Sequence, residues 1–133
     1  MYVSSSSAWR DALGINNTVT VKSATSVSVA STTYTNIANT GSISAGTYII
    51  RGYINYPSNA TGRRVAVFST TSGGSSSYNS MVNTKTAVNG VATYIHLTGL
   101  FTITSATTLY LVAYQNSGST LTCSGRIELL KIH

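Results

Sequence analysis

From residue 19 onward the chain repeatedly alternates apolar and polar side chains. Thr47–Tyr56 shows this most clearly, and Ala92–Ile103 repeats it over a longer run. A period of two residues is typical of a β-strand that buries one face. The same pattern predicts strands at Thr18–Lys22, Ser26–Ala30, Arg63–Thr70, Thr107–Gln115, Thr120–Cys123 and Arg126–Ile132, with a weaker strand at Tyr78–Thr86.

Turn-forming residues separate these runs. Pro57 ends the Thr47–Tyr56 strand, and Asn89–Gly90 is a tight-turn signal. Thr71–Ser77 is rich in Gly and Ser and predicts a flexible loop. Eight to ten short antiparallel strands at this spacing predict an all-β sandwich or barrel. Neither an internal repeat nor a linker divides the pattern, so residues 19–133 are expected to form one domain.

Residues 1–18 differ from the rest of the chain. Only Ala8–Ile15 has helical character, with Ser7 as its N-cap and Gly14 at its end. A helix this short is unstable without a partner. We therefore expect residues 1–18 to be a lead-in to the domain. The chain has no run of 18 apolar residues, so no membrane insertion is expected.

The composition favours a folded sheet protein with an unusually uncharged surface. Thr, Val, Ile and Tyr are plentiful, as they are in strands, and the hydrophobic fraction of 42% argues against disorder. Only 8% of the 133 residues are charged, whereas an ordinary soluble domain has about 25%. The net charge of +6 comes from eight basic residues against two acidic ones.

The basic residues are scattered along the chain, and only Arg63–Arg64 are adjacent. Nucleic-acid binders usually gather positive charge into a stripe with aromatic partners, so nucleic-acid binding is not expected. Weak attraction to an anionic surface, such as a phosphate-rich bacterial envelope, is the milder interpretation of the same charge.

Candidate chemistry is sparse, and we expect no enzyme, metal site or cofactor. The two acids, Asp11 and Glu128, lie far apart, whereas glycoside hydrolysis generally needs a pair of carboxylates. No nucleophile motif accompanies His96, so a catalytic triad is not expected. Hard cations such as calcium need several carboxylates, and the chain has only two. The single cysteine, Cys123, forms no intrachain disulfide and is expected to be a small hydrophobe in a strand.

Several predicted strands carry large side chains on both faces, although a sandwich needs only one buried face per sheet. We therefore expect self-association, with the alternative that isolated apolar side chains simply face solvent. Glu128 is expected to pair with Arg51 or Arg126, and the alternative is a solvated edge residue. The interface residues predicted on this basis are Ile49, Arg51, Tyr53, Tyr94, Leu100 and Glu128.

Loose motifs, mostly glycine turns and strand alternation, occur at Ala45–Ile50, Tyr56 with Asn59–Arg64, Val88–Gly90, Leu97–Ile103 and Thr108–Gly118. Together these motifs resemble the complement/tumour-necrosis-factor-like jelly roll. Bacteriophage fibre tips and bacterial surface heads have this pattern. Trp9–Ile15 is similar to a segment that precedes the head in phage tail-fibre chains. The resemblance, over roughly residues 8–132, implies a homotrimeric jelly-roll head on a virion, joined through its N-terminus to a fibre shaft.

The resemblance also implies a function, which is attachment of a bacteriophage fibre to a saccharide or protein on the host surface. Loops on a rigid sandwich commonly carry binding residues. The candidates are Asn59, Arg63, Arg64, Tyr78, Asn79 and Asn116. Because adjacent strand residues point oppositely, only one of the two arginines would face a ligand, and Tyr78 could instead pack inward. The alternative functions are a structural trimerisation or capping module, a bacterial secreted or spore-surface head, and a hydrolase.

Overall fold

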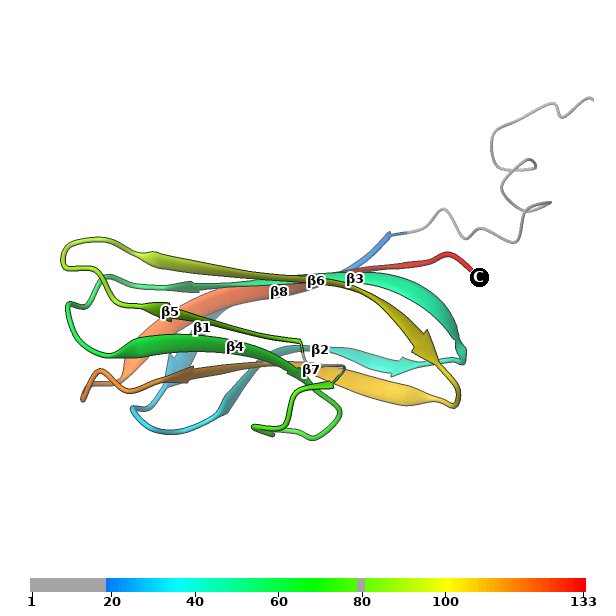
Figure 1. The fold of residues 1–133 in the computed structure, drawn as a ribbon, viewed down its shortest axis with the longest axis horizontal. Coiled ribbons are helices and arrows are strands. Elements are labelled where there is room, and N and C mark those ends of the chain that lie inside the picture. The colour runs from blue at the N-terminus through cyan, green and yellow to red at the C-terminus, as the bar shows by residue number, and fades with distance from the viewer. Residues whose placement is uncertain (1–18, 79–80) are drawn as a thin grey trace, which may run out of the picture.

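The computed structural model describes residues 19–78 and 81–133, which form eight strands in two four-stranded antiparallel sheets (Figure 1). The strands are β1 (Val19–Val29), β2 (Thr35–Ile43), β3 (Gly46–Tyr56), β4 (Arg63–Ser69), β5 (Val82–Thr86), β6 (Thr93–Ile103), β7 (Thr107–Gln115) and β8 (Leu121–Lys131). The all-β prediction is confirmed. No helix in these two ranges is long and apolar enough to cross a membrane. The predicted lead-in, residues 1–18, lies outside the described residues.

The two sheets pack face to face. The first sheet has the strand order β1-β8-β3-β6, and the second sheet has the order β2-β7-β4-β5. Every connection between consecutive strands crosses from one sheet to the other, except the β4–β5 connection within the second sheet. Eight antiparallel strands connected in this way have the topology of a jelly roll.

Two long strands were each expected as two short ones. In β1 the register shifts between Ala24 and Val27, which interrupts the period-two pattern without ending the strand. In β8 the interruption is Gly125, which lies so close to the neighbouring strand that a Cβ there would come within 2.5 Å of the Tyr53 carbonyl oxygen. Both interruptions are local features within continuous strands.

Strand β2 was not predicted at all. Its buried residues, Ile37, Thr40 and Ile43, are three positions apart, so the strand has no period-two signal. Two register shifts against β7 cause this spacing, because each adds an extra residue between inward-facing positions. Bulges therefore hid this strand from a search for simple alternation.

Alternate residues of β3 and β6 face the core. Ile50, Ile54 and Phe101 are fully buried and pack between the sheets, where the Phe68 ring meets the Phe101 ring edge-on with centroids 6.0 Å apart. Gly52 allows the sheets to approach here, since a Cβ at this position would lie 2.7 Å from the Phe68 ring. The odd positions of β3 and the even positions of β6 are left on the outside of the first sheet.

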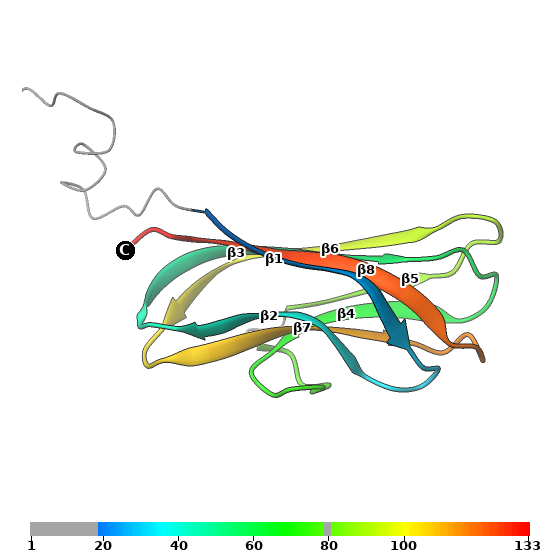
Figure 2. The same ribbon diagram turned by 180° about the vertical axis from the view of Figure 1, so that it is seen from behind.

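The sandwich has two distinct ends. Residue 19 and the C-terminus lie at the same end (Figures 1 and 2), where the Ile132 amide donates to the Thr47 carbonyl oxygen at 2.8 Å. The opposite end, which we call the distal end, carries four connections, at residues 30–34, 57–62, 87–92 and 116–120. Two surfaces follow from this arrangement, namely the outer face of the first sheet and the distal end.

Candidate interaction surfaces

All six predicted interface residues lie on the outer face of the first sheet. The strand register arranges this face in rows across the sheet. One row consists of Val19, Leu130, Ile49 and Leu100, one residue from each strand. Ile49 is 43% exposed and Leu100 is 64% exposed, so this apolar row meets solvent.

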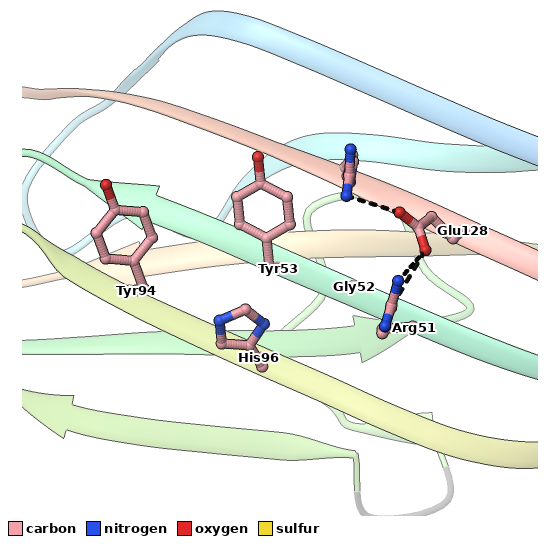
Figure 3. A pocket seen from close by; sticks show the side chains of 7 residues that line it. Arg51, Gly52, Tyr53, Tyr94, His96 and Glu128 are labelled. Carbon is pink, nitrogen blue, oxygen red and sulfur yellow. Dashed lines mark hydrogen bonds and ion pairs between the residues drawn. The ribbon is translucent and has the colours of Figure 1, made fainter.

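An ion cluster spans the next two rows, with Arg51 and Glu128 in one and Arg126 in the other. Glu128 lies between two arginines, with Arg51 Nη2 at 2.5 Å from Oε2 and Arg126 Nη2 at 2.9 Å from Oε1 (Figure 3). The prediction that Glu128 pairs with an arginine is confirmed for both candidates. Two guanidinium groups surround one carboxylate, so the cluster carries a net charge of +1.

The ion cluster lines one side of a shallow hollow of about 380 Å³ (Figure 3). The Tyr53 ring forms its centre, stacked on His96 with centroids 5.8 Å apart and covered by the Arg126 guanidinium at 5.4 Å. Tyr94 lines its far side. Glu128 is the one carboxylate side chain in residues 19–78 and 81–133, and it pairs with both Arg51 and Arg126. The hollow therefore offers stacking surfaces and hydrogen-bond donors.

Four of the six predicted receptor residues come together at the distal end, although their polar groups mainly hold the loops. The Asn116 Oδ1 accepts the Arg63 amide at 2.7 Å, which joins the β7–β8 connection to the start of β4. The Asn59 Oδ1 accepts the Thr61 amide at 2.9 Å within its own turn. Gly62 permits the contact with Asn116, because its φ of +81° is a conformation that favours glycine.

The prediction that Arg64 faces a ligand is wrong, because its side chain is completely buried. Its guanidinium donates to the carbonyl oxygens of Thr61 at 2.9 Å, Asn59 at 3.2 Å and Arg63 at 3.3 Å. Burial lowers the pKa of Arg64 from its usual value. Arg64 thus fixes the β3–β4 connection from inside, while the adjacent Arg63 is exposed, as strand alternation requires.

The other two predicted receptor residues do not join this group. Tyr78 packs inward, with its ring stacked on Phe101 at a centroid distance of 5.4 Å. It belongs to the β4–β5 connection and adds to the core instead of presenting a free aromatic face. Asn79 lies outside the described residues.

A cluster of tyrosines at the distal end was missed. Tyr34 and Tyr114 lie with ring centroids 4.6 Å apart, and the Arg63 guanidinium lies 5.4 Å from the Tyr114 centroid. With Tyr110, these rings cover a small apolar cluster on the outer face of the second sheet, formed by Val65, Val67 and Val112. The spacing of Tyr110 and Tyr114 was an available signal, because residues four apart share a face of a strand.

Cys123 is buried in the core, as expected for a small hydrophobe. Burial raises the pKa of its thiol to about 12, so the thiolate that would react is scarce. Tyr56 is also buried, and its pKa is raised for the same reason. Within residues 19–78 and 81–133, no three His, Cys, Asp or Glu side chains gather as metal ligands.

Neither a protein-family model nor a curated protein matches the chain. Among solved structures, the chain is similar to one reported under the words "Bacillus endospore appendages form a novel family of disulfide-linked pili". The two are 13% identical with a TM-score of 0.42, and the alignment covers 89% of this chain and 94% of the other. Similarity at this level carries no information on function.

Proposed function

We propose that this chain is the non-enzymatic attachment head of a homotrimeric fibre, of the kind found at bacteriophage fibre tips. In this proposal the outer face of the first sheet packs against other copies, and the distal end meets the host surface. The observation that carries the proposal is the apolar row formed by Val19, Leu130, Ile49 and Leu100, which runs across all four strands.

Contiguous apolar surface on a soluble domain is typical of an interaction site. Val21, which pairs in register with Glu128, and Tyr94 are also exposed on this face and add to its apolar surface. Interfaces are enriched in Tyr and Arg, as this face is at Tyr53, Tyr94 and Arg51. A second copy is the occupant that best fits an apolar row beside a cluster containing both charges. The number three comes from the resemblance of the sequence to complement/tumour-necrosis-factor-like heads.

Attachment is supported by the position of the distal end. It lies opposite residue 19, so a shaft joined before that residue would leave the distal connections facing outward. Two of these connections, at residues 57–62 and 116–120, are held by Arg64 and by the Asn116 side chain. A rigid set of loops on a sandwich is suited to recognition.

Self-association is tested by sedimentation velocity at micromolar concentration. We expect three times the chain mass of 13.9 kDa for the wild type and a smaller species for Ile49→Ser combined with Leu100→Ser. Val88→Ser combined with Val91→Ser is the matched control, because both valines are comparably exposed but lie in the distal β5–β6 connection. A wild-type monomer, or equal effects of the two double variants, would contradict the proposed interface.

Attachment is tested by binding of the fluorescently labelled protein to a panel of bacterial cells and purified envelope fractions. We expect saturable binding to some of them without release of sugar fragments. An intact trimer that binds none of them would favour the alternative of a structural trimerisation module. Release of fragments that stops in Glu128→Gln would favour a hydrolase instead.

A further inference from the structure

We infer that Arg63, together with the paired rings of Tyr34 and Tyr114, binds an acidic saccharide at the distal end. This inference rests on the proposed attachment function and names the site and the chemical class of its ligand. The sequence predicted Arg63 as a receptor residue, whereas its position beside these two tyrosines is seen only in the fold.

The three side chains come from three separate segments and are held in place by the sheet. Tyr34 precedes β2, Arg63 begins β4, and Tyr114 is next to the last residue of β7. The Asn116 side chain fixes the Arg63 backbone, and Tyr114 pairs in register with Val65 of β4. The backbone positions of Arg63 and Tyr114 are therefore fixed before a ligand binds, which favours affinity.

The charge of Arg63 is not compensated within the described residues. No hydrogen bond from its guanidinium to another group is formed there, and its partner among the described residues is the Tyr114 ring. The described chain has one carboxylate side chain, Glu128, which two arginines on the first sheet already hold. A ligand with negative charge complements this surface.

A saccharide fits better than a purely anionic or apolar ligand. The half-exposed tyrosine rings give a rigid amphipathic surface of low entropy cost, suited to the C–H face of a sugar ring. The planar fork of an arginine can donate two parallel hydrogen bonds to a carboxylate or a phosphate. The anion is therefore the carboxylate of a uronic or sialic acid, or the phosphate of a polyol-phosphate polymer.

The test is retention of the full chain on immobilised glycans, with each carboxylated glycan beside its neutral counterpart and poly(glycerol phosphate) as the phosphate arm. We expect at least one acidic probe to retain the wild type more than tenfold better than its neutral counterpart. Arg63→Gln and Tyr34→Leu should each reduce that retention about tenfold, and Arg63→Lys should reduce it less. Lys22→Gln is the control, because it removes the same charge from an exposed side chain in β1.

Equal retention of acidic and neutral glycans, or equal loss in Lys22→Gln and Arg63→Gln, would overturn the inference. So would unchanged retention of Arg63→Gln whose thermal midpoint matches the wild type. The outcome remains separate from the proposed function. If Arg63→Gln still attaches to the cells that bind the wild type, attachment stands and this site is wrong, whereas a wild type that attaches to no cell contradicts attachment itself.

Discussion

Replacing Glu128 with glutamine should distinguish an interface from an ordinary exposed sheet face. The carboxylate accepts hydrogen bonds from Arg51 at 2.5 and 3.2 Å and forms an ion pair with Arg126 at 2.9 Å. The substitution keeps the size of the side chain but leaves two guanidinium groups close together without an anion. The consequence depends on whether water reaches the cluster.

The expected magnitudes differ enough to be separated. In an isolated sandwich the two arginine side chains are 59% and 45% exposed, and each exposed pair is worth about 0.2–1 kcal/mol. The total loss would then be about 1 kcal/mol. If three copies bury the cluster, breaking it costs about 3 kcal/mol or more in each copy. Three copies together lose about 9 kcal/mol, which weakens the trimer more than a million-fold because about 1.4 kcal/mol is tenfold.

Sedimentation velocity at micromolar concentration, with thermal unfolding of the same samples, measures both effects. We expect Glu128→Gln to sediment as a folded monomer while Lys22→Gln remains trimeric. A variant that stays trimeric and loses only a few degrees in Tm would refute the reasoning, because it would show that the cluster remains in water.

Three further predictions concern the fold itself. Arg64→Ala should lower the free energy of unfolding by about 3 kcal/mol, because the hydrogen bonds to three carbonyl groups and a buried side chain are lost. Arg63→Ala should change this free energy by less than about 0.5 kcal/mol. Urea titration compares the two variants, and equal losses would contradict the buried role of Arg64. Gly52→Ala should cost about 1–3 kcal/mol in the same assay, since its Cβ would lie 2.7 Å from a core ring, and an unchanged midpoint would show that the sheets can separate. Cys123 and Tyr56 have raised pKa values in the folded state, so these groups ionise more readily in the unfolded chain. The free energy of unfolding should therefore be constant below about pH 9 and fall as the pH rises toward 12. If the stability of Cys123→Ala falls as steeply with pH as that of the wild type, the thiol is excluded as a cause.

Much of the architecture could be predicted from the alternation of apolar and polar side chains along the sequence. The inward and outward faces of β3 and β6 followed directly from their period of two, since both strands pair without any register shift. The pairing of Glu128 with arginine also followed, because a lone acid among bases in a sheet has few other partners. Strand β2 was not accessible in this way, since its two bulges replace the period of two with a period of three.

The distal site shows why local sequence patterns identify residues but not their roles. Arg63 and Arg64 are chemically identical neighbours on β4. Because successive side chains of a strand point to opposite faces, Arg63 is exposed to solvent and Arg64 is buried in the core. The meeting of Tyr34 with Tyr114 depends on β2 pairing with β7, which is far away along the chain. Such a contact follows from topology, which alternation does not specify.

The position of β8 has a consequence for synthesis of the chain. β8 pairs with both β1 and β3, so the first sheet lacks a central member until residue 131 has left the ribosome. The apolar strands of a nascent chain therefore lack their partners until late in synthesis, because most contacts in this fold are long-range. Sandwiches dominated by such contacts fold in about milliseconds to seconds. Completion of the first sheet therefore awaits the emergence of β8, the last strand of the domain.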